Sequence, residues 1–237
     1  MFVPREGCVL VDADYSQIEL RVLAAISGDE NMITAFREGQ DIHTNTASQV
    51  FGMPPEFVTP LMRSRAKAVN FVIVYGIGAF SISGDIGVSV AEADQYIKNY
   101  LKTYSGVQNY MDSTKKLAAE QGYVTTLFHR RRYLPELASS NRITRAFGER
   151  VAMNTPIQGT AADIIKIAMV RVYQRLKKEN LEARLMLQVD EELIVEAPEA
   201  EADKVMALLK EEMEQAVNLA VPMLVEAKTG RTWYESK

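Results

Sequence analysis

The sequence is poor in the side chains that form disulfides and zinc sites. It has one cysteine, Cys8, and two histidines among 237 residues. This excludes an internal disulfide and a His/Cys zinc site. No apolar run approaches the roughly 20 residues needed to cross a bilayer, and residues 1–7 lack the basic and apolar regions of a signal peptide. We therefore expect a cytoplasmic protein without a membrane partner.

Charge is unevenly spread along a chain whose composition is otherwise that of an ordinary globular protein. Hydrophobic residues make up 47% and charged residues 24%, and the formal net charge is −4. Residues 60–150 hold thirteen Lys or Arg against seven Asp or Glu, a local charge of +6, so the flanking parts are acidic. Such a chain can offer cations to phosphates and carboxylates to metal ions.

Two acids follow a short apolar run near the start of the sequence. Val9–Val11 predicts a buried strand, and residues 15–26 have the apolar spacing of a helix. Asp14 then lies where the strand ends and the helix begins. A carboxylate held there suits a divalent cation, but aspartate is also a preferred helix N-cap, so both interpretations stay open.

Cations and aromatic rings recur on one face of a predicted helix that ends at Gly76. This face carries four such residues at intervals of four positions, namely Arg63, Lys67, Phe71 and Tyr75. Two cations followed by two rings would suit the phosphates and the base of a nucleoside triphosphate. The alternative is a solvated basic turn followed by core aromatics.

A separate helix is predicted to start after Asp41, a favourable N-cap residue, and to end near Phe51. His43 falls in its first turn. A lone histidine at such a position is either a structural residue or a ligand-binding one, and the local sequence does not decide between them.

Two further segments carry concentrated charge. Arg130–Arg132 follow a predicted strand or ribbon at residues 123–128, and they form either a surface patch or a phosphate-binding loop. Residues 185–195 read as two strands around the acids 190–192, a hairpin pattern. Three adjacent carboxylates repel one another unless cations share them, although a turn in water tolerates them.

The remaining pattern alternates helices and breaks. We expect a loop at residues 77–90, helices at 91–104 and 107–121, a helical region at 149–178 broken at Asn154–Pro156, a helix at 199–217 and a strand near 221–225. Strands at both ends and helices between them predict an α+β domain with a helical insertion.

In their shared order these segments resemble the signature motifs of the family A DNA polymerases, the bacterial DNA polymerase I type. The resemblance rests on Asp14–Arg21, on the helix from Arg63 to Gly76 and on the acidic hairpin. Further matches lie at residues 41–44, 122–135, 154–163 and 233–237. The resemblance covers essentially the whole chain.

The resemblance implies the palm and fingers of a hand-shaped polymerase. It places the first part of the palm at residues 1–40, the fingers at 41–145, and the second part of the palm, with the hairpin, at 146–237. The palm would be an antiparallel sheet with flanking helices, and the fingers a mostly helical insertion. No segment resembles a thumb, so we expect a monomer that needs a thumb region supplied elsewhere.

The implied reaction is template-directed DNA synthesis, in which dNTPs are added to a primer 3′ end by two-metal nucleotidyl transfer. The implied cofactor is a pair of Mg²⁺ ions, for which Mn²⁺ can substitute, and the partners are primer–template DNA and dNTPs near the nucleoid. The implied metal ligands are Asp14, the backbone carbonyl of Tyr15, and Glu191, with Asp190 or Glu192 as further candidates. The implied catalytic residues are Asp14, Glu191 and Lys67.

The resemblance also implies contacts to the nucleotide and to DNA. The implied nucleotide-binding residues are Gln17, Glu19, His43, Arg63, Lys67, Phe71 and Tyr75. Arg63 and Lys67 would hold the triphosphate, and Glu19 would crowd the sugar 2′ position. The implied DNA-binding residues are Arg130, Arg131, Arg132, Arg150, Asn154 and Gln158.

Three positions depart from the family pattern. Asp190 stands where the family has histidine, and Glu191 stands where it has the second catalytic aspartate. The extra methylene moves the carboxylate by roughly 1.5 Å, which matters for the strict geometry of Mg²⁺. Val72 replaces a glycine beside Phe71 and is expected to stiffen the helix and crowd the templating base. We therefore expect impaired catalysis. The alternatives are a primer–template or nucleotide binder without catalysis, and a folded fragment with no role on DNA.

Overall fold

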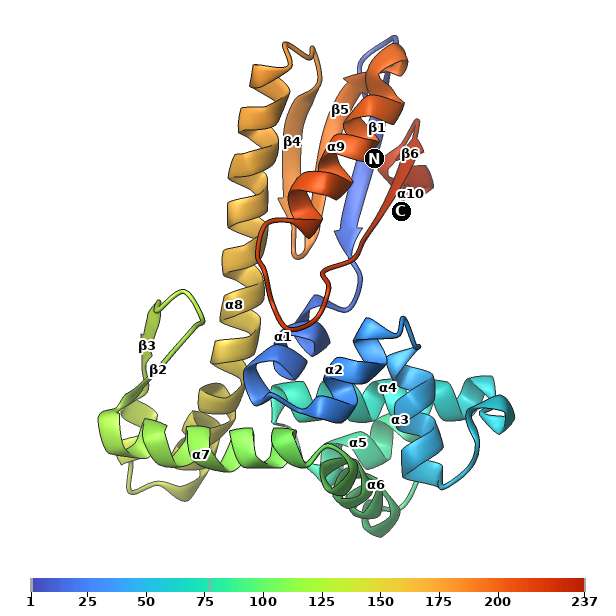
Figure 1. Cartoon of the computed structure of the whole chain (residues 1–237). Helices are drawn as coiled ribbons and strands as arrows, with labels where there is room; N and C mark the ends of the chain where they lie inside the picture. Colours follow the sequence, from blue (N-terminus) through green and yellow to red (C-terminus); the bar gives the residue numbers. More distant parts are fainter. Residues whose placement is uncertain (1, 77, 237) are drawn as a thin grey trace. The chain divides into compact units, whose positions relative to one another are not determined.

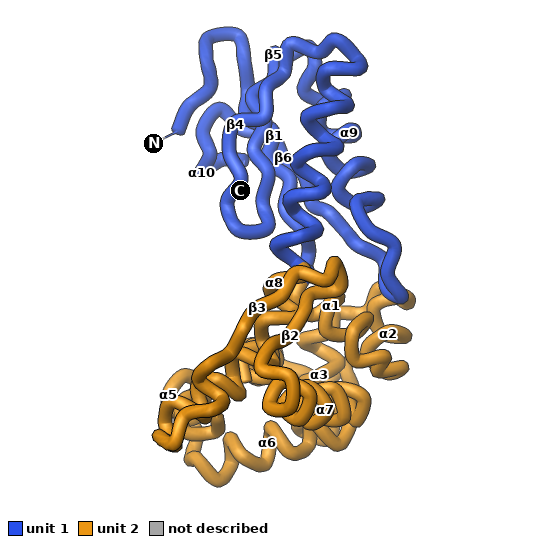
Figure 2. Tube along the Cα trace, turned by 90° about the vertical axis from the view of Figure 1, so that its left-hand side faces the viewer, with its two compact units in different colours: residues 1–18, 161–237 blue, residues 19–160 orange. Residues whose placement is uncertain are grey.

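The computed structural model describes residues 2–76 and 78–236. Ile77, in the expected loop, and Lys237, in the C-terminal motif, therefore lie outside the described residues. The chain divides into two compact units: unit 1 consists of residues 1–18 and 161–237, and unit 2 of residues 19–160 (Figure 2). The α+β fold class is confirmed, with an antiparallel sheet in unit 1 and a mostly helical segment between its two parts.

Unit 1 is built on a four-stranded antiparallel sheet in the order β4-β5-β1-β6 (Figure 1). Its strands are β1 (Cys8–Tyr15), β4 (Arg184–Val189), β5 (Glu192–Pro198) and β6 (Val225–Gly230). The helix α9 (Ala202–Glu214) packs against β1, β5 and β6, and the short α10 (Trp233–Ser236) packs against β1 and β6. The central strands β1 and β5 are buried for most of their length, as expected for strands covered on both faces.

The strand β1 is longer than predicted, and this corrects one interpretation of Asp14. Tyr15 still belongs to the strand, where it pairs with Val225, and the helix α1 begins only at Ile18. Asp14 is therefore not a helix N-cap. Gln17, in the turn between the strand and the helix, has a positive φ of 56°, which is uncommon for a residue with a side chain.

The last strand of the sheet lies later in the chain than predicted. Residues 221–224 precede it, although Val221 and Met223 are buried. Pro222 has no N–H to donate to a strand ladder, so pairing with β1 begins only at Val225. The prediction of a last strand is confirmed, but its position near residues 221–225 is wrong.

Unit 2 is mostly helical, and several predicted helix ends are confirmed. Its elements are α1 (Ile18–Ser27), α2 (Glu30–Arg37), α3 (Ile42–Phe51), η1 (Pro55–Phe57), α4 (Pro60–Tyr75), α5 (Ala79–Ile86), α6 (Val90–Thr103), α7 (Ser105–Gln121), β2 (Tyr123–Thr125), β3 (Arg131–Tyr133), η2 (Pro135–Ala138) and the first part of α8 (Arg142–Lys178). Asp41 caps α3 by accepting a hydrogen bond from the His43 N–H, and Gly76 and Gly122 end α4 and α7 in the left-handed conformation. Ile18, the first residue of α1, and residues 161–178 of α8 belong to unit 1.

Two predictions in this part of the chain are wrong. The expected loop after Gly76 contains α5, because the fully buried Ile82 compensates for the helix cost of Gly84, about 1 kcal/mol. The expected break at residues 154–156 is absent, since α8 is one helix with Pro156 inside it. Proline removes one backbone donor at a cost of about 3 kcal/mol, but Met153 and Ile157 on either side of it are buried and hold the helix in place.

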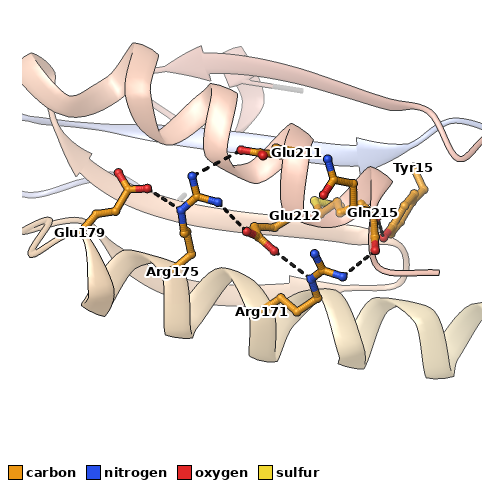
Figure 3. Close-up of polar contacts among 8 residues, drawn as sticks. Tyr15, Arg171, Arg175, Glu179, Glu211, Glu212 and Gln215 are labelled. Atoms are coloured by element: carbon orange, nitrogen blue, oxygen red, sulfur yellow. Dashed lines mark hydrogen bonds and ion pairs between the residues drawn. The ribbon is translucent and has the colours of Figure 1, made fainter. Parts of the chain in front are cut away.

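A network of ion pairs joins α8 to α9 within unit 1 (Figure 3). Glu212 lies between Arg171 and Arg175, at 2.8 Å from each. The Arg171 guanidinium also donates to the backbone carbonyl of Gln215 just after α9. In the same region the buried Tyr15 hydroxyl donates to the carbonyl of Met213 at 2.5 Å. The end of β1 is thus tied to the end of α9, which α8 holds in turn.

Replacing Tyr15 with phenylalanine should destabilise unit 1 by about 1–2 kcal/mol, because it leaves the buried Met213 carbonyl without this hydrogen bond. Urea unfolding followed by circular dichroism would measure the loss. Tyr234→Phe is the matched control, since Tyr234 is 89% exposed. Equal stability of the two variants would contradict the structural role of the Tyr15 hydroxyl.

Candidate active site

The C-terminal end of β1 presents an exposed carboxylate, that of Asp14. Side chains alternate along a strand, so Asp14 projects from the sheet face opposite to Tyr15, whose hydroxyl bonds to α9. Asp14 lies directly across from Glu192 on β5 and from Glu226 on β6. Residues paired in this way point to the same face. Three acids therefore follow one row across the sheet.

The acidic hairpin meets β1 at this end. Val189 pairs with Glu192, so the turn consists of Asp190 and Glu191. Asp190 has a positive φ of 46°, which the favoured two-residue turns of β-hairpins require at their first central residue. The Tyr15 N–H donates to the Glu191 carbonyl at 3.4 Å. The structure thus brings together the two acidic segments that the sequence places at opposite ends of the chain.

Glu192 differs from the other two acids of the predicted tip. It is the first residue of β5, it is buried, and its carboxylate accepts a hydrogen bond of 2.6 Å from the Trp233 indole N–H. Only Asp190 and Glu191 form the turn itself. The sequence pattern of three consecutive acids therefore combines a buried, hydrogen-bonded carboxylate with two at the turn.

The electrostatics of the tip favour a bound cation. Burial, together with the negative charges of Asp190 and Asp14, raises the pKa of Glu191. A divalent ion shared by Asp14 and Glu191 would relieve this repulsion. Across residues 2–76 and 78–236, no three His, Cys, Asp or Glu side chains form a ready metal-binding group. Two carboxylates and a backbone carbonyl fit Mg²⁺, which usually keeps water and substrate oxygens as its other ligands.

The helix α4 in unit 2 carries the predicted row of cations and rings. Arg63, Lys67 and Phe71 are exposed, and Tyr75 is half-buried. The Lys67 ammonium lies 5.9 Å from the centre of the Phe71 ring, which stacks on Tyr75 with ring centres 6.3 Å apart. The row thus forms one continuous surface of charge and aromatic area, suited to a phosphate chain and a base.

Val72, beside Phe71, is buried, in contrast to that exposed row. Its side chain packs inside unit 2 together with Ile73 and Val74. A valine here fills core volume, so its replacement by glycine would leave a cavity and weaken α4.

The start of α3 places an ion pair beside His43. The Asp41 carboxylate accepts hydrogen bonds from the Arg63 guanidinium and the Thr44 hydroxyl. Burial alone would raise the pKa of Asp41, but these bonds and that from the His43 backbone lower it to about 2. Burial lowers the pKa of His43 to about 4. The positive charges of Arg63 and Lys67 also lower it, whereas the negative charge of Asp41 raises it. His43 is therefore neutral at physiological pH.

Acid should destabilise the chain in two separate pH ranges. His43 binds a proton less readily when folded (pKa about 4) than when unfolded (about 6.5), so stability falls as the pH drops through this range, by up to about 3 kcal/mol. The contribution of Asp41 is complete above its ordinary pKa of 3.8 and is lost only as the pH falls towards 2. Urea unfolding as a function of pH would measure both ranges.

The variant His43→Gln should flatten the upper of these two ranges and leave the lower one. His129→Gln is the matched control, because His129 is exposed. An unchanged upper range in His43→Gln would contradict the assignment to His43.

Other predicted nucleotide-binding residues lie near the start of α1. The Tyr75 hydroxyl donates to the Glu19 carboxylate at 3.4 Å, so Glu19 lies beside the aromatic end of the α4 row. Gln17 lies two residues earlier, in the left-handed conformation described above. Such a backbone conformation costs energy and is often found at functional sites.

The predicted DNA-binding residues gather around α8 and the β2–β3 hairpin. Arg131 and Arg132 lie in strand β3 rather than in a loop. Arg130 donates to the Gly159 carbonyl at 2.9 Å, and the Arg132 guanidinium lies 3.4 Å from the Thr155 hydroxyl. Gly159 is required for this packing, because a Cβ there would lie 2.7 Å from the Thr126 methyl group.

The end of α4 also contacts α8. Asn154 donates to the Val74 carbonyl at 3.2 Å, and a Cβ on Gly76 would lie 2.6 Å from the Met153 side chain. Arg150 is exposed, over the Phe147 ring at 5.7 Å, and Gln158 is exposed. Within unit 2 the predicted DNA-binding and nucleotide-binding residues therefore belong to elements that touch each other.

Sequence reasoning missed two parts of the site. Glu226 was not among the predicted residues, because the last strand was predicted near residues 221–225, and the observed register places it opposite Asp14. Trp233 was treated only as part of a terminal motif. Trp233 is half-buried, and its indole N–H can only donate, so it needs an acceptor, which the structure shows to be the Glu192 carboxylate. In the part of the chain that the structure describes, no helix is long and apolar enough to span a membrane.

Comparisons with known proteins agree on one family. The family model described as DNA polymerase family A matches residues 1–235. The chain is 54% identical to DNA polymerase I of Caldicellulosiruptor bescii and 53% identical to that of Bacillus caldotenax, over its whole length in both cases. It spans 28% and 27% of these relatives, respectively.

A solved structure is similar over nearly the whole chain. It is the POL domain of Pol1 from M. smegmatis, in complex with DNA primer-template and dNTP. The TM-score is 0.95 at 42% identity, covering 99% of this chain and 42% of that one.

Proposed function

Since the chain belongs to the family A DNA polymerases, we propose that it is the catalytic core of a template-directed DNA polymerase. In this proposal it adds dNTPs to the 3′ end of a primer by two-metal nucleotidyl transfer. The observation that carries the proposal is the hydrogen bond between Tyr15 and Glu191, which joins the two acidic segments at the end of β1. The row of cations and aromatic rings on α4, which suits a triphosphate and a base, also supports the proposal.

Members of this family generally use divalent metal ions. We propose Mg²⁺, with Mn²⁺ as a substitute, held by Asp14, Glu191 and the backbone carbonyl of Tyr15. When bound, the ions supply the positive charge that activates the primer hydroxyl and stabilises the leaving pyrophosphate. The role of the protein is to hold the two carboxylates together despite their repulsion. The backbone hydrogen bond between Tyr15 on β1 and Glu191 in the hairpin does this.

On the nucleotide side, we propose that Arg63 and Lys67 bind the triphosphate with His43 beside them. Phe71 would lie against the sugar and base, and Tyr75 near the templating base. The Glu19 carboxylate, oriented by the Tyr75 hydroxyl, would exclude a 2′-hydroxyl from the sugar. The charged side chains position the substrate and offset its charge, which is the main task of a protein in phosphoryl transfer.

We propose that primer–template DNA binds to the residues on α8 and the β2–β3 hairpin. The residues concerned are Arg130, Arg131, Arg132, Arg150, Asn154 and Gln158. The division into palm at residues 1–40 and 146–237 and fingers at 41–145 remains part of this proposal, as do a monomeric state and a place in the cytoplasm with the DNA. The chain spans 28% of the first of these relatives, and a thumb region supplied elsewhere also remains part of this proposal.

A second candidate function is binding of primer–template DNA or nucleotide without turnover. The observation that favours it is the tip itself, where Glu191 is one methylene longer than aspartate and Asp190 adds a further negative charge. The longer side chain weakens the fit of a metal ion, and the negative charge of Asp190 repels the phosphates of a primer strand.

Primer extension by this chain, at high protein concentration and with Mg²⁺ or Mn²⁺, separates the two functions. The proposed polymerase extends a primed template by the complementary dNTP, and the extension requires the metal ion. Salt-sensitive DNA binding without any extension under both metal ions would support the second function and contradict the first.

A further inference from the structure

Four polar side chains form a buried cluster in the interior of unit 2. They are His43, Thr46, Asn70 and Tyr104, with exposed fractions of 5%, 0%, 0% and 3%. They come from α3, α4 and the residue between α6 and α7. A buried polar group without a partner costs about 1–3 kcal/mol, so such a cluster is expected to be fully hydrogen-bonded.

The chemistry of each group gives the chain of hydrogen bonds a direction. Thr46 Oγ1 lies 3.1 Å from Asn70 Oδ1, which can only accept, so the Thr46 hydroxyl donates there. Thr46 also shares a hydrogen bond with Tyr104. Burial raises the pKa of Tyr104, so its phenol stays protonated at neutral pH.

The other end of the chain fixes the proton on the imidazole. Asn70 Nδ2 lies 2.9 Å from His43 Nδ1. An amide nitrogen can only donate, so His43 Nδ1 accepts. A neutral imidazole carries one proton, and with Nδ1 as acceptor that proton is on Nε2.

We propose that Asn70, with its amide oriented by Thr46, is a positioning residue that holds His43 in the neutral Nε2–H tautomer. His43 then acts as a neutral hydrogen-bond donor to the phosphate oxygens of a nucleoside triphosphate. The second statement rests on the proposed function, whereas the first concerns the folded chain alone.

The charges around His43 explain why a fixed tautomer matters. The groups that act on it are the Asp41 carboxylate and the cations of Arg63 and Lys67. Burial and the two cations keep the ring neutral, against the opposing effect of the Asp41 carboxylate. Phosphate oxygens accept hydrogen bonds, so the Nδ1–H tautomer would point a lone pair at them, and only the Nε2–H tautomer donates. The two cations supply charge, and His43 supplies a directed donor without a third positive charge.

Nitrogen-15 NMR of the full chain, labelled on its histidines, tests the first statement without any assay of activity. His129→Gln assigns the His43 signals, because the chain has two histidines. The expected pattern is a protonated Nε2 and an unprotonated Nδ1 at neutral pH. A protonated Nδ1 in this protein would overturn the proposal, since it means that the Asn70 amide has the opposite orientation.

Three variants examine the role of the Thr46 hydroxyl. Thr46→Val removes it and should allow the Asn70 amide to turn, so that the Nδ1–H tautomer appears. Thr46→Ser keeps the hydroxyl and should keep the tautomer. Tyr104→Phe removes a buried hydrogen bond from the same cluster but leaves the Thr46 donor, so it should also keep the tautomer. A tautomer that is the same in all three variants would contradict the orienting role.

The second statement is tested by the dependence of primer extension on dNTP concentration. Thr46→Val should raise KM for dNTP by about tenfold or more, the scale of a lost hydrogen bond to a charged group. In the background of His43→Gln, whose amide donates without a tautomer, the same change should alter KM less than twofold. A loss in kcat alone, or equal losses in both backgrounds, would overturn the link to the nucleotide.

The His43 tautomer and its contact with the nucleotide are tested separately. If the chain showed no extension at all, the proposed function would fail, and the NMR result would still decide the tautomer. Binding of dATP to the full chain and to Thr46→Val, measured by calorimetry, would then replace KM, with a tenfold weaker binding expected and equal binding contradicting the nucleotide contact.

Discussion

Replacing Asp14 with asparagine should lower the rate of primer extension by at least about 10²–10³-fold. The amide keeps the size of the side chain but removes the negative charge at the end of β1, where Asp14 is exposed and close enough to raise the pKa of Glu191. The expected loss is the scale found when one preorganised charge-stabilising group is removed from an active site. It should appear in kcat more than in KM for dNTP, because the proposed triphosphate contacts lie on α4.

Single-turnover extension with saturating dNTP would measure this loss. Asp203→Asn makes the same chemical change at an exposed acid on α9 and should leave the rate unchanged. Removing the repulsion at the hairpin tip should leave Asp14→Asn at least as stable as the parent chain in urea. A variant that keeps more than a tenth of the parent rate would contradict a metal-binding role for Asp14.

Local chemistry made parts of this fold predictable. Asp41, Gly76 and Gly122 mark helix ends through interactions with their own neighbouring backbone, so their roles follow from a few adjacent residues. The hairpin at residues 184–198 is similarly marked by two apolar strands and an acidic turn. The motifs that indicated the family lie on these same elements.

Other features depend on residues far apart in the sequence. Pro156 lies within a continuous helix because Met153 and Ile157 are buried, which no local preference predicts. The end of β1 is set by pairing of Tyr15 with Val225. The proposed tautomer of His43 depends on the side chains of Asn70 and Thr46, so the residues next to His43 in the sequence do not decide between a structural and a functional role.

The structure also changes how the departures from the family pattern should be weighed. Val72 is buried, so its replacement by glycine would damage the packing of unit 2 and obscure any gain at the exposed face of α4. Glu191 lies in the two-residue turn, where shortening its side chain removes no core volume. The length of the Glu191 side chain can therefore be tested alone.

Replacing Glu191 with aspartate should raise the rate of primer extension, by up to about 100-fold. The Tyr15–Glu191 hydrogen bond involves only backbone atoms, so it fixes the turn relative to β1 whichever side chain is present. On that fixed backbone, the shorter side chain withdraws the carboxylate by roughly 1.5 Å, the displacement that the extra methylene of glutamate is expected to cause. Misplacement on the order of 1 Å can cost about 10²-fold in rate, which sets the size of the gain.

The measurement is single-turnover extension over a range of Mg²⁺ concentrations, since a better-placed carboxylate should also lower the concentration needed for half-maximal rate. Glu120→Asp, the same change at an exposed acid on α7, is the control and should have no effect. The combination Glu191→Asp with Asp14→Asn should be as inactive as Asp14→Asn alone, because the proposed ions need both carboxylates. A rate for Glu191→Asp equal to or below that of the parent chain would mean that the hairpin already adapts to glutamate, and that its extra methylene is not what limits catalysis.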